Sequence, residues 1–260
     1  MRVVQCQHRE PNAMPFYAAI EGDELTALAS SPFSEPIRLR HSEKHSLGDV
    51  RLLPPVIPSK VVAIGKNYRD HIEEMGGMAP AEPLVFLKPS SSVIGPGAPI
   101  LLPALSERVE HEAELAIVIR SRCRRVAESE ASAVILGVTA LNDVTARDLQ
   151  KLDGQWSRAK GFDTFCPIGP AIAFGLDPGH LRVTSRINGE TRQDSSTDQL
   201  VFGVGRLIAH ITAFMTLYPG DVIATGTPGG VGPLLDGDTI EVEVEGVGTL
   251  TNPVMADPDA

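Results

Sequence analysis

The sequence contains few cysteines and no long apolar segment. Its 260 residues include only Cys6, Cys123 and Cys166, which are too far apart to form a metal knuckle or a redox pair. An odd and sparse set of cysteines is typical of a reducing compartment, so we expect the protein in the cytoplasm. No stretch approaches the ~20 apolar residues of a membrane span, and the N-terminal segment MRVVQCQHRE lacks the apolar core of a signal peptide.

The sequence also has fewer basic than acidic residues. Lysine and arginine total 23 against 33 aspartates and glutamates, which gives a formal net charge of −10. Such a chain is disfavoured as a non-specific binder of nucleic acid or of anionic membranes. An anionic small substrate would need a local cationic site, and a bound metal ion could provide one. The 42% of hydrophobic and 22% of charged residues indicate a globular protein.

A proline-rich segment separates two regions of the chain. In RLLPPVIPSK, Pro54, Pro55 and Pro58 favour an extended chain over a helix. Before it, VVQCQ and PFYAAIEGDELTAL have the composition of short strands with a turn at residues 21–23. We therefore predict a small N-terminal β domain at residues 1–57 and a larger domain at residues 58–260.

The second region alternates short strands with turns and shows no regular repeat. The segments PLVFLKP, ELAIVIR, GVTAL, RVTSRING, DVIATGT and EVEVEG each have the composition of a strand. Few segments have the pattern of a helix. The expected architecture is therefore a mixed, β-rich α+β roll or barrel rather than a βαβ alternation.

Three predicted helices carry specific expectations. The helix in KNYRDHIEEMGG should end near residues 76–77, where two glycines could stop the helix or serve as a hinge. The helix in TARDLQ should have Thr145 as its N-cap. The helix within residues 198–217 should place Leu207, Ile211 and Phe214 on one side.

The stretch VEHEAELAIVI, residues 109–119, joins acidic residues to an apolar strand. Its last five residues are all apolar, as in a strand buried on both faces. Alternation places Glu112 and Glu114 on the same face as Ala116 and Val118, with the two carboxylates ~7 Å apart. Two buried carboxylates this close repel one another unless a cation lies between them. The alternative is that both glutamates lie just outside the core at a strand end.

A second acidic strand provides a comparison. In DTIEVEVEGVG, Glu241, Glu243 and Glu245 alternate with apolar residues, as in a strand with one solvated face. We expect these glutamates to be solvated. Glu112 and Glu114 differ from them because their own strand face becomes apolar further along.

Asp143 is a third acidic residue that follows a predicted strand. An Asn-Asp pair at a strand-to-helix turn, as in ALNDVTARDLQ, is common for conformational reasons alone. Together with Glu112 and Glu114, however, Asp143 would complete a cluster of three carboxylates. Oxygen ligands without a nearby cysteine suit Mg²⁺ or Mn²⁺, with Ca²⁺ as a substitute in crystals, rather than Zn²⁺. His111 should point to the opposite face of the strand.

Seven motifs occur in an order that resembles the fumarylacetoacetate hydrolase family. They are GKNYRDH, FLKP, HEAEL, NDVTARDLQ, DGQWSRAKGFDTFCPIGP, PGDVIATGTPGGVG and GTLTNPV, between about residue 50 and residue 254. The chain is most similar to the bacterial branch often labelled 2-hydroxyhepta-2,4-diene-1,7-dioate isomerase. One departure is Ala113, which stands where the family usually has glycine between the two glutamates.

The resemblance implies a set of site residues. Glu112, Glu114 and Asp143 would be the metal ligands. A His-Glu pair on a mobile helix and a lysine would be catalytic, while a glutamine and a Thr-Gly-Thr loop would contact the substrate. In this sequence these further positions are His71, Glu74, Lys160, Gln150, Thr225, Gly226 and Thr227.

Residue chemistry agrees with these roles but leaves simpler alternatives. His71 and Glu74 would share a helix face, so the carboxylate could orient the imidazole as a general-base pair requires; a solvated surface pair is the alternative. Lys160, expected in a loop, could hold a substrate carboxylate or an enolate, or be an ordinary surface lysine. The TGTPGGVG loop can direct amides and hydroxyls toward an anion. Trp156 should be a packing anchor, and Cys166 should be buried and unreactive.

The resemblance implies an enzyme that acts on a 2-oxo or 2,4-dioxo acid through a metal-stabilised enolate. Isomerisation is the activity of the labelled branch. Hydrolysis of an acylpyruvate or fumarylpyruvate and decarboxylation of oxaloacetate share that enolate and are alternatives. A non-catalytic small-acid binding protein is an alternative from another class. We expect a small-molecule 2-oxo acid as partner, no nucleic acid, no membrane, and a homodimer.

Overall fold

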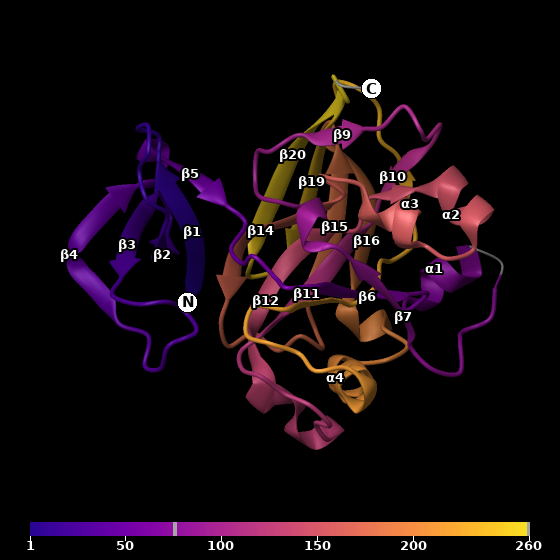
Figure 1. Cartoon of the computed structure of the whole chain (residues 1–260), viewed down its shortest axis with the longest axis horizontal. Coiled ribbons are helices and arrows are strands. Elements are labelled where there is room, and N and C mark those ends of the chain that lie inside the picture. Colours follow the sequence, from indigo (N-terminus) through magenta and orange to yellow (C-terminus); the bar gives the residue numbers. More distant parts are fainter. Residues whose placement is uncertain (75–76, 259–260) are drawn as a thin grey trace.

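β-Strands form most of the computed structural model (Figure 1), which describes residues 1–74 and 77–258. The largest sheet has twelve strands in the order β4-β3-β2-β1-β14-β12-β11-β17-β6-β7, with β5 paired to β1 and β8 paired to β14. These strands are β1 (Arg2–His8), β2 (Phe16–Glu21), β3 (Glu24–Leu28), β4 (Leu39–Ser46), β5 (Val50–Leu53), β6 (Val61–Gly65), β7 (Leu84–Lys88), β8 (Val93–Ile94), β11 (Ala113–Ile119), β12 (Ile135–Asn142), β14 (Cys166–Ala173) and β17 (Val222–Ala224).

Two smaller sheets complete the β structure. Five strands pair in the order β16-β15-β19-β20-β9, and three pair in the order β13-β10-β18. These strands are β9 (Ile100–Leu102), β10 (Val109–His111), β13 (Thr145–Ala146), β15 (Arg182–Ile187), β16 (Glu190–Ser196), β18 (Gly232–Pro233), β19 (Thr239–Val244) and β20 (Gly248–Ala256). The β-rich α+β prediction is confirmed; the sheets formed by the described residues are open and close no barrel.

The helices are short and lie around the sheets (Figure 1). They are α1 (Arg69–Glu74), α2 (Arg147–Asp153), α3 (Ser157–Gly161) and α4 (Val204–Phe214), with 3-10 turns η1 (Leu47–Asp49), η2 (Ser90–Ser92), η3 (Glu128–Val134) and η4 (Thr197–Gln199). α1, α2 and α3 lie on the same side of the molecule, while α4 lies along another edge. Within the described residues, no helix has the length and apolar character needed to cross a membrane.

β11 is buried along its whole length and lies between two hydrophobic clusters. Leu115, Ile117 and Ile119 belong to the larger cluster, which also contains residues of β19, β20 and α4. Ala116 and Val118 belong to the second cluster, with residues of β6 and β17. Each fully buried leucine or isoleucine contributes about 1.5–3 kcal/mol relative to exposure. This packing fixes the strand that contains Glu114 and directly follows Glu112.

The strands β1–β5 lie to one side of the rest of the chain (Figure 1). The predicted turn at residues 21–23 between two short strands is confirmed, because β2 and β3 pair antiparallel with Glu21 opposite Glu24. β1 also pairs antiparallel with β14, where Val3 lies opposite Ile172. The N-terminal strands therefore extend the large sheet.

Two expectations about helix ends have different outcomes. Thr145 is not an N-cap: it lies in β13, its hydroxyl donates to the carbonyl of Asp143 at 2.8 Å, and the cap residue of α2 is Ala146. An N-cap would accept a backbone N–H of the following helix at its side-chain oxygen, whereas the Thr145 hydroxyl is directed to a carbonyl within the preceding turn. α1 ends at Glu74. Of the two glycines predicted as a stop or hinge, Gly76 lies outside the described residues, and the N–H of Gly77 donates to the carbonyl of Ile72 at 3.1 Å.

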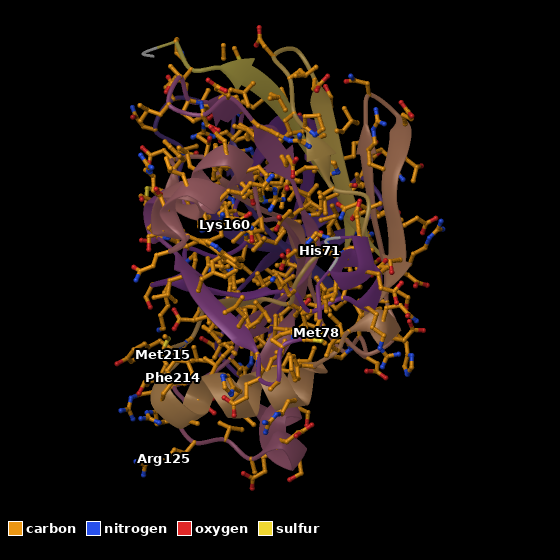
Figure 2. The ribbon with its side chains drawn as sticks, turned by 90° about the vertical axis from the view of Figure 1, so that its right-hand side faces the viewer. His71, Met78, Arg125, Lys160, Phe214 and Met215 are labelled. Atoms are coloured by element: carbon orange, nitrogen blue, oxygen red, sulfur yellow. The ribbon has the colours of Figure 1, made fainter. Side chains whose placement is uncertain are left out.

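The apolar face of α4 is shorter than predicted. Leu207 and Ile211 are fully buried, whereas Phe214 is 52% exposed. Phe214 is the last residue of the helix and lies at the molecular surface (Figure 2). Its ring packs edge-on against His210, with 5.8 Å between ring centroids. The predicted face is thus wrong at Phe214, because the helix extends beyond the core it covers.

Candidate active site

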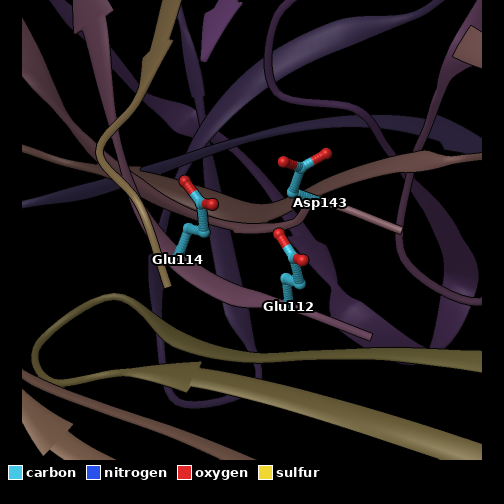
Figure 3. A group of neighbouring side chains, drawn as sticks. All are labelled: Glu112, Glu114 and Asp143. Atoms are coloured by element: carbon cyan, nitrogen blue, oxygen red, sulfur yellow. The ribbon is translucent and has the colours of Figure 1, made fainter. Parts of the chain in front are cut away.

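Three acidic side chains meet where β11 and β12 lie side by side (Figure 3). Glu112 precedes β11, Glu114 is the second residue of β11, and Asp143 follows β12. The side chains converge because antiparallel pairing sets Ala113 opposite Asn142. One carboxylate oxygen from each residue lies within 4.8 Å of the others, and no residue of the three is more than 5% exposed. The alternative that the glutamates lie outside the core is wrong.

Lys160 bridges two of these carboxylates. Its Nζ donates to Glu112 Oε2 at 2.8 Å and to Asp143 Oδ2 at 2.6 Å. The residue is 2% exposed and belongs to α3, so the prediction of a loop lysine is wrong; Figure 2 shows it within the molecule. Burial alone would lower the pKa of Lys160, but the charges of Asp143 and Glu112 outweigh burial and raise it. The ammonium is therefore charged.

Two further cations complete this network, and the sequence reasoning missed both. Lys88, the last residue of β7, is fully buried, and its Nζ lies 2.6 Å from Asp143 Oδ1. Arg147, the first residue of α2, pairs with Glu112 Oε1 at 2.5 Å and with Glu110 Oε2 at 2.6 Å. The available signals were a lysine that ends the apolar strand LVFLK and an arginine that follows the acidic turn in NDVTAR.

The two glutamates of the pair have opposite electrostatic environments. Burial alone would raise the pKa of Glu112, but Lys160 and Arg147 outweigh burial and hold that pKa well below its usual range. Burial, followed by the charges of Asp143 and Glu112, raises the pKa of Glu114 well above its usual range. The cluster therefore holds Glu112 as a carboxylate, while the charge on Glu114 is unfavourable.

Glu114 has no ion-pair partner among the described residues. Its Oε2 accepts a hydrogen bond from the backbone N–H of Gly226 at 2.7 Å. A buried carboxylate without a counter-ion is costly. A cation bound among the three carboxylates would lower this electrostatic cost. Three converging carboxylate oxygens fit a hard divalent ion such as Mg²⁺, Mn²⁺ or Ca²⁺.

His71 and Glu74 lie one turn apart on α1, but their environments differ. His71 is 6% exposed, whereas the side chain of Glu74 is 46% exposed. His71 Nδ1 lies 3.6 Å from Glu74 Oε2, which is close but longer than a normal hydrogen bond. Glu74 Oε2 accepts the backbone N–H of Gly230 at 3.1 Å. The alternative of a solvated surface pair is therefore wrong for His71.

The three carboxylates, Lys160 and His71 line one narrow cavity of about 50 Å³. Gln150, Thr227 and Trp156 are also in its wall. Arg147 Nη1 donates to Gln150 Oε1 at 2.6 Å, which fixes one end of that carboxamide. Trp156 packs edge-on against Phe86 with 5.2 Å between ring centroids, so it is a packing residue that also borders the site.

The Thr-Gly-Thr loop is bonded to β11. Thr225 Oγ1 donates to the carbonyl of Leu115, and Thr227 Oγ1 donates to the carbonyl of Ala113, both at 2.9 Å. Of the three loop residues, Thr227 borders the cavity. Ala113, where glycine was expected from the resemblance, is fully buried and belongs to the larger hydrophobic cluster, so its methyl group is accommodated.

Other predictions concern residues outside the cavity. Cys166 is fully buried, and burial raises the pKa of its thiol to about 12, as expected for an unreactive sulfur. His111 points away from the carboxylates and contacts Gly232 O at 2.9 Å and Ser185 Oγ at 3.1 Å. Two glutamates of β19 are partly exposed and pair with Arg186, so the contrast between the two acidic strands is confirmed.

Comparisons with known proteins agree with this geometry. The family profile described as fumarylacetoacetate (FAA) hydrolase C-terminal matches residues 60–255. The crystal structure of 5-carboxymethyl-2-hydroxymuconate delta-isomerase from Mycobacterium smegmatis is 48% identical, with a TM-score of 0.91 over 99% of this chain and 100% of that chain. The mitochondrial oxaloacetate tautomerase Fahd2a of Rattus norvegicus is 42% identical over 215 residues, covering 78% of this chain and 69% of the rat protein.

A more distant structure contains ligands. Maleylpyruvate hydrolase from Sphingobium sp. SYK-6, in complex with manganese(II) ion and pyruvate, is 31% identical, with a TM-score of 0.81 over 98% of this chain and 99% of that chain. The family profile covers most of the present chain, and the isomerase and tautomerase relatives are enzymes. The chain is therefore an enzyme of the fumarylacetoacetate hydrolase family.

Proposed function

We propose that this protein is a divalent-metal-dependent isomerase or tautomerase of a small 2-oxo or 2,4-dioxo acid. The observation that carries the proposal is the buried cluster of Glu112, Glu114 and Asp143, whose oxygens converge although Glu114 has no ion-pair partner among the described residues. Lys160 and His71 border the same cavity. A carboxylate cage beside an ammonium and an imidazole suits an anionic substrate that exchanges a proton.

Mg²⁺ or Mn²⁺ held by the three carboxylates would supply Lewis-acid polarisation of a substrate's carboxylate and adjacent keto oxygen, which favours enolisation. The chain's own residues would then manage charge and protons. Lys160 keeps a positive charge beside Glu112 and Asp143, where the oxygen of an enolate would develop its charge.

His71 is the proposed proton carrier. Its Nδ1 faces the carboxylate of Glu74 at 3.6 Å, so a small approach would let Glu74 orient the ring and balance an imidazolium. Glu74 itself is held by the N–H of Gly230 at 3.1 Å. Burial of His71 beside the cavity keeps water away from the exchanging proton.

We propose that the substrate is contacted by Gln150 and by the Thr-Gly-Thr loop at residues 225–227. Gln150 and Thr227 border the cavity and can meet a ligand directly. Thr225 and Gly226 are bonded to Leu115 and Glu114. We therefore propose that these two support binding by placing the loop against the cluster.

Relatives favour isomerisation or tautomerisation over the alternatives. The isomerase at 48% identity and the tautomerase at 42% identity are both named for a proton shift. Hydrolysis of an acylpyruvate is the second candidate, because the related hydrolase binds manganese(II) ion and pyruvate and His71 with Glu74 could activate water. Oxaloacetate decarboxylation is a further alternative, in which loss of CO₂ would leave a metal-stabilised enolate that then takes up a proton.

Three broader proposals accompany this function. We propose a division into residues 1–57 and 58–260, supported by a family profile that begins at residue 60. We propose a cytoplasmic location, supported by three cysteines that are all free. We propose a homodimer, by family resemblance; light scattering that gives a monomer mass at micromolar concentration would contradict it.

A turnover screen with Mg²⁺ and Mn²⁺ tests the proposed function. The substrates are enol-oxaloacetate, a hydroxydienedioate, an acylpyruvate and keto-oxaloacetate, which report tautomerisation, isomerisation, hydrolysis and decarboxylation. We expect a proton-shift reaction above the spontaneous rate that is lost with EDTA and in Glu114→Gln. Glu241→Gln is the control, because Glu241 pairs with Arg186 outside the cavity. Metal-dependent binding of these acids with no turnover would instead support the non-catalytic binding protein.

A further inference from the structure

Side chains support the segment that carries the acidic pair. The break between β10 and β11 falls at Glu112, so regular strand pairing is interrupted there. The Glu112 N–H donates to Asn142 Oδ1 at 2.9 Å, and the Ala113 N–H donates to Gln193 Oε1 at 2.9 Å. The carbonyl of Ala113 accepts the hydroxyl of Thr227 at 2.9 Å. Side-chain groups thus replace the missing strand partners.

Gln193 connects this segment to the Thr-Gly-Thr loop. It is 1% exposed in β16, a strand whose other residues are mostly exposed. Its Nε2 donates to Thr227 Oγ1 and to the carbonyl of Pro228, both at 2.8 Å. Its Oε1 accepts the N–H of Ala113 and, at 3.1 Å, the hydroxyl of Ser185. A carboxamide has two donor and two acceptor positions, and Gln193 uses all four.

We propose that Gln193 is a positioning residue for the metal-binding pair. Its carboxamide holds Ala113, and since Glu112 and Glu114 are the two neighbours of Ala113, a shift of this residue moves both carboxylates. The inference rests on the proposed function, because it concerns the same metal cluster. Gln193 is not among the described residues that line the cavity, so it acts through the backbone and Thr227.

The size of the expected effect follows from the role of such partners. Residues that orient metal ligands typically contribute ~10–100-fold to metal affinity. Replacing Gln193 also leaves buried partners unpaired, which lowers stability in any case. A test must therefore separate metal affinity from stability.

Asn252 supplies a matched control. It is a buried carboxamide in β20, 1% exposed, and its Nδ2 donates to the carbonyls of Gly95 and Ala98 at 2.9 and 2.8 Å. These partners lie outside the acidic cluster. Asn252→Leu should therefore lower thermal stability without changing the geometry of the carboxylates.

The experiment measures Mn²⁺ affinity of the full-length protein by the EPR signal of the free ion. Gln193→Met should bind Mn²⁺ ~10–100-fold more weakly than the wild type, while Asn252→Leu should match the wild type. If Gln193→Met fails to fold, Gln193→Asn keeps the polarity but is too short to reach all four partners. Hydrogen exchange at the Ala113 amide provides a metal-free measurement, and it should quicken in the Gln193 variants but not in Asn252→Leu.

Distinct outcomes separate the two proposals. Wild-type Mn²⁺ affinity together with wild-type Ala113 exchange in the Gln193 variants would overturn the positioning role. Equal weakening of Mn²⁺ binding in Asn252→Leu would overturn it as well, since stability alone would then explain the loss. If the wild type binds no Mn²⁺, the metal-dependent function fails; the Ala113 exchange rate then decides whether Gln193 holds this segment.

Discussion

Removing the charge of Lys88 should destabilise the protein even without a ligand. Lys88 is fully buried, with its ammonium 2.6 Å from Asp143 Oδ1, and it donates to the carbonyls of Lys160 and Val144 at 2.6 and 3.2 Å. Loss of one partner of a buried ion pair costs about 3–5 kcal/mol. Because Lys160 still pairs with Asp143 in Lys88→Met, we expect about 3 kcal/mol, the lower end of that range.

Thermal and urea unfolding of the metal-free protein measure this effect. A chain of this size changes its Tm by ~2–4 °C per kcal/mol, so Lys88→Met should lower the Tm by ~6–12 °C. Lys44→Met is the control. Lys44 pairs with Glu24 at 2.7 Å, but the two side chains are 53% and 54% exposed, so its loss should change the free energy of unfolding by less than ~1 kcal/mol.

A double variant separates lost charge pairing from lost packing. If the buried pair causes the destabilisation, Lys88→Met combined with Asp143→Asn should be more stable than the sum of the two single effects predicts. A Lys88→Met protein within ~0.5 kcal/mol of the wild type would refute the reasoning. Strict additivity in the double variant would refute it too, because the two side chains would then not interact.

Three further predictions concern the site and the core. Glu114→Gln should leave the Tm of the metal-free protein level or higher, because the repulsion between carboxylates is removed. If the variant binds Mg²⁺ 100-fold more weakly, then at a Mg²⁺ concentration of 100 times the wild-type Kd the stabilisation by Mg²⁺, measured by calorimetry, should fall from about 2.7 to about 0.4 kcal/mol. His71→Ala should retain inhibition by oxalate but lose ~10²–10⁴-fold in turnover, whereas Asp143→Asn should lose both. An equal loss of oxalate affinity in the two variants would contradict the assignment of proton transfer to His71 and of metal binding to Asp143. Since burial raises the pKa of Cys166 to about 12, its thiol should be protonated at pH 8 and should not react with iodoacetamide in the native protein. Labelling of Cys166 detected by mass spectrometry would contradict this prediction.

The sequence predicted the acidic cluster because its signal is local. Alternation fixes the face of Glu112 and Glu114, and the apolar residues after them indicate burial. The contrast with the half-solvated strand β19 follows from the same alternation. Asp143 could be added because it directly follows a predicted strand. Strand periodicity thus places side chains on a face before the fold is known.

The cations of the site could not be predicted in this way. Lys88 and Arg147 are buried by contacts with residues distant in sequence, and a lysine or arginine is ordinarily exposed. Thr145 illustrates a different limit, since its hydroxyl bonds within the turn rather than to the helix that follows. Phe214 has the right spacing for a core face but lies beyond the edge of the core. Tertiary contacts decide the positions of Lys88, Arg147 and Phe214, whereas a local hydrogen bond within the turn decides that of Thr145.

The parallel pairing of β17 with β6 has a consequence for synthesis of the chain. Val61 lies opposite Val222, so the strand that leads into α1 must wait for a partner from the last part of the polypeptide. β11 can pair with β12 as soon as both strands have been synthesised, yet the other edge of β11 stays unpaired until β17 has been synthesised. An open apolar edge invites pairing with other chains. A product that stops before residue 220 would contain the strand pair of the acidic cluster but would lack the strand against which β6 docks, and with it the platform that brings His71 to the cavity.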